Sequence, residues 1–172
     1  MYRSSDVRII LVIETIRYFL ETGKILPCPT IVPDELNVKA GTFVSIKKNK
    51  RLRGCVGAIL PQTENLAKEI IRNTVSAASR DPRFSPIVKS ELSELSFTVD
   101  VLAKPEKVKS FDELDCKKYG VVIKNGDRQS ILLPNLEGVE TVQKQIQVCR
   151  EKAGLEYNVP LEIFRFKSLR YF

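Results

Sequence analysis

Histidine is absent from this sequence of 172 residues. Histidine is the usual general base beside a serine or cysteine nucleophile, and it is the commonest metal ligand. Its absence excludes Ser-His, Cys-His and His-metal mechanisms within the chain. Any general base must therefore be a carboxylate, a lysine, a tyrosine, a thiolate or a group on a ligand.

Long apolar runs are also missing. The longest run near the N-terminus, residues 9–13, ends at Glu14, whereas a membrane-spanning helix needs about 20 apolar residues. No small-residue cleavage site follows this run, so we expect a cytoplasmic protein with no membrane contact. Its thiols should then be reduced rather than paired in disulfides. The four cysteines are Cys28, Cys55, Cys116 and Cys149.

Signatures of metals and cofactors are lacking as well. No two cysteines show the Cys-x-x-Cys spacing of zinc or redox sites. Gly54 and Gly57 have the spacing of only part of a dinucleotide-binding fingerprint, and no Gly-Lys-Ser phosphate loop is present. We therefore predict neither a metal site nor a cofactor.

Positive charge is in excess, with 28 lysines and arginines against 21 acidic residues and a net charge of +7. Such an excess raises the question of an anionic partner. A solvated hairpin explains the densest basic cluster about as well as a phosphate-binding patch does. Because no nucleic-acid recognition motif accompanies the charge, nucleic-acid binding is the least favoured function. The cluster comprises Lys47, Lys48, Lys50, Arg51 and Arg53.

Helical periodicity appears in three segments, residues 5–20, 65–78 and 139–153. We expect Ser4 or Ser5 to cap the first helix and Gly23 to end it. The second should stop at Asp81-Pro82, and the third before Gly154. Cys149 falls on the apolar stripe of the third helix and is interpreted as a packing residue.

Apolar runs and two-residue alternation indicate several strands. Two pairs of runs suggest hairpins, one around residues 47–51 and one around Asn125-Gly126. Residues 26–33 contain three prolines and form an extended connector. With hairpins outnumbering strand-helix-strand units, we predict a single α+β domain over residues 1–172, a mainly antiparallel sheet flanked by helices. The expected strands are residues 43–46, 52–60, 95–101, 121–123, 131–133 and 161–166.

The stretch from Leu52 to Gly57, Leu-Arg-Gly-Cys-Val-Gly, is the strongest candidate for a site. Glycine is costly inside a strand and usually marks a bulge or a close backbone approach. In the functional interpretation, Gly54 and Gly57 admit a ligand or another main chain, Arg53 supplies charge, and Cys55 is a nucleophile or contact. In the structural interpretation, Cys55 is a small buried residue of a bulged strand.

A thiol at Cys55 needs a nearby cation to become reactive. Arg53 is one candidate, and Arg72, Arg80 or Arg83 could serve if the second helix folds back on the hairpin. Without histidine, a binding role for Cys55 is favoured over covalent catalysis. The segment Asp81-Pro82-Arg83-Phe84 is either the rim of the same pocket or a structural corner.

Taken together, these motifs resemble the AMMECR domain family, in particular its bacterial AmmeMemoRadiSam system protein A type. The likeness spans nearly the whole chain, although the absence of tryptophan and histidine departs from many relatives. The resemblance implies an α+β fold with two unequal lobes and a cleft lined by the motif at Leu52, Arg53, Gly54, Cys55 and Gly57, with Asp81 and Arg83 as neighbours. The matching segments are residues 21–24, 41–44, 52–57, 81–84, 119–122, 132–139 and 152–155.

The resemblance also implies partners, namely a Memo-like protein and a radical S-adenosylmethionine enzyme. It supplies no known reaction, so whether the chain is an enzyme stays open. The favoured function is the binding of a small molecule or modified substrate in the Cys55 cleft. The alternatives are a non-catalytic adaptor between proteins and, less favoured, a nucleic-acid-binding domain.

Overall fold

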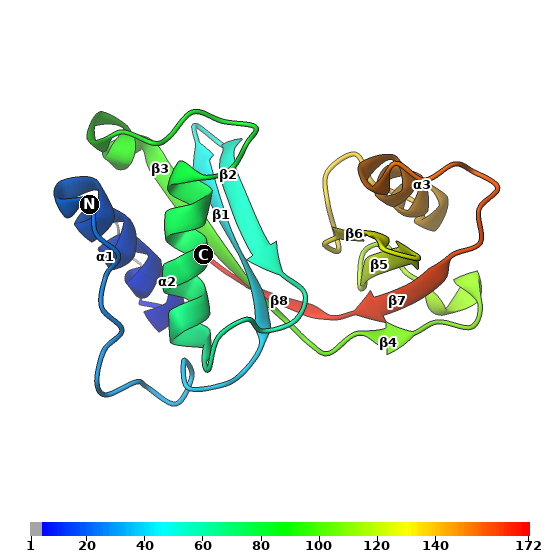
Figure 1. Cartoon of the computed structure of the whole chain (residues 1–172), viewed down its shortest axis with the longest axis horizontal. Coiled ribbons are helices and arrows are strands. Elements are labelled where there is room, and N and C mark those ends of the chain that lie inside the picture. The colour runs from blue at the N-terminus through cyan, green and yellow to red at the C-terminus, as the bar shows by residue number, and fades with distance from the viewer. Residues whose placement is uncertain (1–4) are drawn as a thin grey trace. The chain divides into compact units, whose positions relative to one another are not determined.

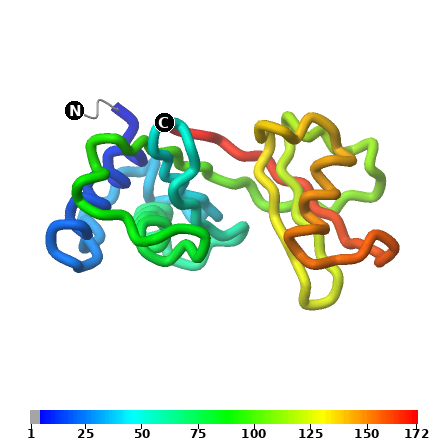
Figure 2. The backbone as a smooth tube through the Cα atoms, turned by 90° about the horizontal axis from the view of Figure 1, so that it is seen from above, coloured from blue at the N-terminus to red at the C-terminus, as the bar shows by residue number. Residues whose placement is uncertain are grey.

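The computed structural model describes residues 5–172. The chain divides into two compact units. The first comprises the residues up to Val101 together with Leu169–Phe172, and the second comprises Leu102–Ser168. Within the second unit, the Ala103 N–H donates to the Lys167 carbonyl at 2.9 Å. Figure 2 shows the path of the backbone through each unit.

The first unit is a four-stranded sheet in the order β2-β1-β3-β8, with two helices packed against it (Figure 1). Strand β1 pairs antiparallel with β2. A buried core that includes Val12, Ile16, Val44, Ile70 and Val99 joins the helices to the sheet. The elements are α1 (Val7–Thr22), β1 (Gly41–Lys48), β2 (Arg51–Ala58), α2 (Leu66–Ser79), the 3-10 helix η1 (Lys89–Glu94), β3 (Leu95–Leu102) and β8 (Ser168–Tyr171).

The second unit is another four-stranded sheet, in the order β4-β7-β5-β6, with one helix against it. The pairs β4–β7, β5–β7 and β5–β6 are all antiparallel. Its own core includes Val121, Ile123 and Cys149, so the packing role predicted for Cys149 is confirmed. The elements are β4 (Glu106–Lys107), the 3-10 helix η2 (Phe111–Glu113), β5 (Gly120–Asn125), β6 (Arg128–Leu132), α3 (Val142–Ala153) and β7 (Glu162–Phe166).

The predicted fold class, antiparallel sheets flanked by helices in two lobes, is confirmed. The strands form two separate sheets, each with its own core, rather than one. Sequence periodicity shows which segments are strands, but it does not show which strands share a sheet. Strands β4 and β8 are short and were not predicted.

Helix ends follow capping chemistry. The cap of α1 is Asp6 rather than Ser5, because an Asp6 carboxylate oxygen accepts the Arg8 N–H at 2.9 Å. Ser4, the other predicted cap, lies outside the described residues. Gly23 ends α1 at φ 71°, as expected. Helix α3 begins at Val142, three residues later than predicted, because the Thr141 side chain caps it.

Both hairpin turns contain fewer residues than the sequence indicated. The first consists of Asn49 and Lys50 alone, whose φ angles of 50° and 66° suit a two-residue turn. The strands therefore extend through Lys47, Lys48 and Arg51, which were expected in the loop. In the second hairpin Asn125 pairs with Arg128, so the turn consists of Gly126 and Asp127.

Candidate functional site around Cys55

Strand β2, which carries the motif, is an edge strand of the first sheet and pairs with β1 on one side. Ile46 lies opposite Gly54, but Lys47 lies opposite Leu52. Arg53 is therefore the extra residue of a β-bulge. A bulge re-aims side chains, and here it gives Arg53 and Cys55 different surroundings.

The two glycines accommodate parts of the protein itself. A Cβ atom at Gly54 would lie 2.2 Å from the carbonyl oxygen of Ala77 on α2. A Cβ atom at Gly57 would lie 2.2 Å from the Thr42 carbonyl oxygen and 2.4 Å from Cγ of Phe43. The sequence left open whether the glycines make room for a ligand or for another main chain. In this structure both glycines make room for main-chain atoms of the protein.

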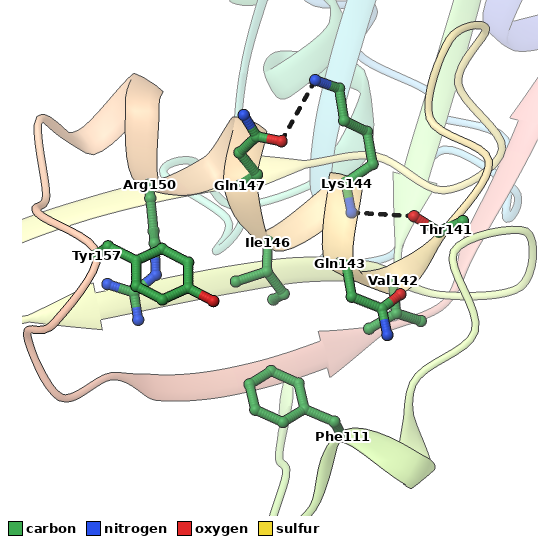
Figure 3. A pocket seen from close by; sticks show the side chains of 9 residues that line it. All are labelled: Phe111, Thr141, Val142, Gln143, Lys144, Ile146, Gln147, Arg150 and Tyr157. Atoms are coloured by element: carbon green, nitrogen blue, oxygen red, sulfur yellow. Dashed lines mark hydrogen bonds between the residues drawn. The ribbon is translucent and has the colours of Figure 1, made fainter.

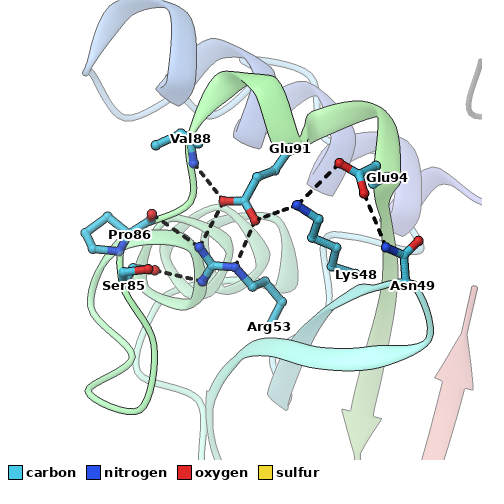
Figure 4. A network of polar contacts seen from close by, with 8 residues as sticks. All are labelled: Lys48, Asn49, Arg53, Ser85, Pro86, Val88, Glu91 and Glu94. Carbon is cyan, nitrogen blue, oxygen red and sulfur yellow. Dashed lines mark hydrogen bonds and ion pairs between the residues drawn. The ribbon is translucent and has the colours of Figure 1, made fainter.

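Arg53 anchors the segment that follows α2 (Figure 4). Its Nε and Nη2 donate to the two carboxylate oxygens of Glu91 at 3.1 and 2.9 Å. Its Nη1 donates to the Ser85 carbonyl at 2.7 Å. Only 15% of the Arg53 side chain is exposed. A planar guanidinium fits this two-point contact with a carboxylate, so Arg53 fastens residues 85–91 to the bulge of β2.

The contact with Arg53 lowers the pKa of Glu91. The hydrogen bonds from Arg53 are the largest cause that lowers the pKa of Glu91, to about 2. Lys48 also donates to Glu91, at 3.3 Å, and forms an ion pair with Glu94 at the same distance. Two of the five cations of the basic hairpin are thus paired with acids, which weakens the phosphate-binding interpretation of that cluster.

Cys55 lies directly opposite Ser45 in the β1–β2 register. The Ser45 hydroxyl donates to the Cys55 Sγ at 3.3 Å. The Cys55 N–H donates to Oδ2 of Asp81 at 2.9 Å, and its carbonyl accepts from Nη2 of Arg83 at 3.3 Å. The side chains of Asp81 and Arg83 thus bind the main-chain groups that an adjacent strand would otherwise bind at this edge.

Asp81 and Arg83 are themselves tightly joined. Arg83 donates to the Asp81 carboxylate through its backbone N–H at 3.1 Å, Nε at 2.9 Å and Nη2 at 2.7 Å. These bonds lower the pKa of Asp81 to about 2, with the Arg83 side chain as the largest cause. The Asp81 side chain is 3% exposed and that of Arg83 is 55% exposed. The pair therefore forms a structural corner and also presents a fixed guanidinium beside Cys55.

The thiol of Cys55 is half-buried and is not activated. Burial is the largest influence on its pKa and raises it above the ordinary value. The Ser45 hydrogen bond and the charge of Arg83 lower the pKa, while Asp100 and Asp81 raise it. The cation that acts on this thiol is Arg83 rather than Arg53. At neutral pH Cys55 is a neutral thiol, which is a poor nucleophile.

Three neighbours of the site were not predicted from the sequence: Ser45, Asp100 and Arg170. Asp100 lies on β3 and is buried, and its Oδ1 accepts from Nε of Arg170 on β8 at 2.9 Å. Asp100 occupies a polar position in the alternating pattern of β3, and Ser45 interrupts the apolar residues of β1. Neither residue could be connected with Cys55 before the strand pairing was known.

Leu52, the first residue of the motif, is exposed on β2 and precedes the bulge. All four cysteines are free thiols. No group of three acidic, cysteine or histidine side chains within residues 5–172 could hold a metal ion. None of the helices in this range combines the length and apolar composition that crossing a membrane requires.

Comparison of this chain with known proteins identifies its family. The AMMECR1 family model matches residues 9–171. A protein of Thermotoga maritima is 43% identical over 162 residues, which cover 92% of this chain and 93% of that protein. A protein of Clostridium acetobutylicum is 42% identical over 171 residues, or 98% of this chain, but this chain spans only 36% of its length.

A solved structure has the same fold. The crystal structure of an uncharacterised protein from Pyrococcus horikoshii superimposes with a TM-score of 0.88 at 26% sequence identity, covering 95% of this chain and 88% of that one. The class defined here is thus an α+β domain of two sheets, with the bulged Leu-Arg-Gly-Cys-Val-Gly motif on an edge strand. The chain belongs to the AMMECR1 family.

Proposed function

We propose that the chain binds a small molecule or a modified substrate beside Cys55. The observation that carries the proposal is the position of Arg83. Its guanidinium is fixed by Asp81 and by the Cys55 carbonyl, yet more than half of the side chain is exposed. A preorganised cation next to a half-buried thiol suits an anionic or polar group of a ligand. The cleft expected around this motif stays a prediction.

Binding is a better account of the site than covalent catalysis. The raised pKa of Cys55 disfavours the thiolate, and the chain has no histidine to act as its base. In this proposal Cys55 and Ser45 contact the ligand, and Arg83 supplies charge. Arg53, Gly54 and Gly57 shape the strand that presents them.

The proposed setting is an AmmeMemoRadiSam-type pathway, with a Memo-like protein and a radical S-adenosylmethionine enzyme as partners. The support for this setting is the resemblance of the motifs to that type within the family. Co-expression of the three proteins, followed by affinity purification of this chain, tests it. Recovery of both partners at a fixed ratio is expected. Recovery of neither would contradict the setting without touching the ligand-binding proposal.

Native mass spectrometry tests the ligand proposal itself. The full chain, purified after co-expression with both proteins, should carry a small molecule that Cys55→Ala and Arg83→Gln fail to retain. Cys28→Ala is the matched control, because Cys28 is another half-buried thiol of the same unit. Retention of the molecule by all three variants alike would refute a ligand site at Cys55.

A non-catalytic adaptor is the second candidate function. One observation favours it: Arg53, Gly54 and Gly57 all make contacts within the chain. These contacts account for the motif residues without a ligand. If partner binding persists unchanged in Cys55→Ala and Arg83→Gln, and no small molecule is found, the adaptor function is the one to keep.

A further inference from the structure

The second unit contains a pocket that lies along α3 (Figure 3). Its volume is about 840 Å³, which is within the range of roughly 300–1,000 Å³ typical of small-molecule sites. A smaller hollow of about 300 Å³ shares Phe111 and Arg150 with it, so these two side chains lie where the hollows meet. Every lining residue belongs to the second unit, so this pocket, here called the α3 pocket, contains none of the residues around Cys55.

One row of side chains on α3 forms a wall of the pocket. Val142, Ile146 and Arg150 all line it, and they follow one another at intervals of four residues. Residues four apart lie on the same face of a helix, and each interval spans about 6 Å along the axis. Phe111 faces this row from η2 and is 57% exposed. The wall is therefore apolar at its first two residues and ends in a guanidinium.

The guanidinium of Arg150 uses only one of its edges within the protein. Nη1 donates to the Glu156 carbonyl at 2.6 Å. Nη1 and Nη2 both donate to the Val159 carbonyl, at 3.3 and 3.2 Å. Across residues 5–172, Arg150 forms no ion pair with a carboxylate. The two carbonyls hold the edge formed by Nη1 and Nη2 against the loop after α3, and they leave the positive charge without a counter-charge.

The other edge of this guanidinium, formed by Nε and Nη2, is the one that binds a carboxylate elsewhere in the chain. Arg53 donates through the same two nitrogens to the two oxygens of Glu91, at 3.1 and 2.9 Å. Two parallel N–H groups match the two oxygens of a carboxylate in spacing and direction. In Figure 3, Nε of Arg150 lies on the side of the guanidinium nearer Ile146. The α3 pocket thus has at one end an edge suited to a carboxylate.

Contacts within the unit fix this cation and the rings around it. The central carbon of the Arg150 guanidinium lies 5.7 Å from the centre of the Tyr157 ring. An aromatic face attracts a cation at this distance, and the contact leaves the guanidinium edge at Nε available. Glu113 accepts from two backbone N–H groups at 2.8 and 3.1 Å, which fixes the segment that carries Phe111. The pocket is therefore formed before any ligand arrives, which lowers the entropic cost of binding.

Lys144 borders the pocket, but its charge lies elsewhere. It is two residues from both Val142 and Ile146, which places it about 200° around the helix from each. Its Nζ donates to Oε1 of Gln147 at 3.4 Å, and Figure 3 shows the ammonium directed away from Phe111. The cation available to a ligand inside the pocket is therefore Arg150.

We propose that the α3 pocket binds a small monocarboxylate with an aromatic or apolar body. The carboxylate accepts from Nε and Nη2 of Arg150, and the body packs between the Phe111 ring and Ile146. An anion is favoured over a neutral group, because it supplies the missing counter-charge and accepts through two oxygens. A body of about 6 Å is long enough to reach from Arg150 to the preceding turn of α3. This site is independent of the one at Cys55, so the two proposals can fail separately.

The test uses 3-phenylpropionate as the probe and 3-phenylpropionamide as its uncharged counterpart of the same length. Each is titrated into the full chain at pH 7 while backbone amide and arginine Nε–H signals are followed by NMR. For the carboxylate we expect saturable shifts at residues 109–113 and 141–159 and at Nε–H of Arg150. The dissociation constant should be about 1 mM or below. The amide should bind about ten-fold more weakly, since it is uncharged and presents only one oxygen.

Two variants separate this edge from general charge attraction. Arg150→Lys keeps the charge but loses the paired N–H groups, and it should weaken 3-phenylpropionate about ten-fold. Lys144→Gln is the matched control, because it removes a charge from another face of α3, and it should change the affinity by less than about two-fold. Arg150 also holds the loop after α3, so the amide signals of residues 154–159 check the fold of Arg150→Lys. The comparison of the two probes in the parent chain depends on no variant.

Phe111→Ala tests the body of the ligand. It should weaken both probes, because it removes the ring that faces α3. Phe111 is exposed, so its removal should leave the fold intact, and circular dichroism checks this.

Several outcomes would overturn the proposal. Equal affinity for the two probes, or no saturable shift with 3-phenylpropionate, would exclude a carboxylate site. Equal weakening by Arg150→Lys and Lys144→Gln would mean nonspecific charge attraction. Concentration-dependent shifts at Phe111 and Tyr157 without any probe would mean that a second copy of the chain covers the pocket. Unchanged binding in Cys55→Ala is expected and keeps this result separate from the function proposed above.

Discussion

Asp81 and Cys55 are 26 residues apart in the sequence, and the Asp81 carboxylate accepts the Cys55 backbone N–H at 2.9 Å. The bond joins the corner after α2 to the edge strand that carries the thiol. Because Arg83 donates to the same carboxylate, Asp81, Arg83 and Cys55 form one hydrogen-bonded cluster. The stability of the fold should therefore depend on this Asp81–Arg83–Cys55 cluster and on the Arg53 anchor beside it.

Acid should weaken the fold through Asp81. Its pKa is lowered from 3.8 to about 2 in the folded chain. A lowered folded-state pKa adds stability above the unfolded pKa, and that stability is lost as the pH falls through the folded value. The free energy of unfolding should therefore drop by about 2 kcal/mol from this group between roughly pH 4 and pH 2. Urea denaturation at each pH measures it.

Asp81→Asn supplies the comparison for the acid effect. It should be less stable at pH 7 by about 2–3 kcal/mol, since it removes a buried charged partner of Arg83. It should also lose the Asp81 share of the acid response, leaving that of Glu91. If the variant and the parent chain lost stability in parallel below pH 4, the lowered pKa of Asp81 would be wrong.

Arg53→Lys should destabilise the chain by about 1–2 kcal/mol, because an ammonium cannot make the two-point contact with Glu91. Arg51→Lys is the control, since Arg51 is exposed on the same strand, and it should change stability by less than about 0.5 kcal/mol. Chemical denaturation of both variants at pH 7 measures the difference. Equal effects would show that Arg53 is not an anchor.

Gly54→Ala should destabilise the fold by about 3 kcal/mol, because the new methyl group would press on the Ala77 carbonyl of α2. Leu52→Ala, a change at an exposed position of β2, should cost much less. Thermal denaturation of the two variants measures this. A stable Gly54→Ala protein would mean that α2 can move away from β2 at little cost.

Alkylation of Cys55 should be slow at neutral pH and should accelerate only above the pH at which an ordinary cysteine reacts. Ser45→Ala should shift this profile to still higher pH, because the Ser45 hydrogen bond lowers the pKa of the thiol. Mass spectrometry of the Cys55 peptide after timed iodoacetamide treatment measures both profiles. Fast labelling at pH 7, or a shift to lower pH in Ser45→Ala, would contradict the geometry.

The sequence predicted well those elements whose limits are set by local chemistry. Helix α2 was predicted within one residue, because Asn65 caps it and Asp81-Pro82 prevents its continuation. Strand β3 was predicted from strict two-residue alternation. The two-residue strand β4 was missed because its pairing with β7 bridges distant segments.

The candidate site was located by its glycines and its cysteine, but the role of each residue depends on long-range contacts. Arg53 acts through Glu91, which is 38 residues away, and no local pattern connects them. Whether a glycine faces a ligand or a helix depends on the packing of α2, which the sequence does not specify. Phe111 on η2 and Tyr157 in the loop after α3 both line a pocket, but they are far apart in the sequence, and no local pattern connects them.

The hydrogen bonds that Asp81 and Arg83 make to Cys55 also bear on how copies of the chain behave toward one another. An unprotected outer strand can recruit a strand from a neighbouring molecule and extend the sheet. Here the side chains of a corner occupy the groups through which such recruitment would begin. The contacts that hold the thiol in position therefore also discourage self-association, so a weakened corner would favour aggregation as well as unfolding.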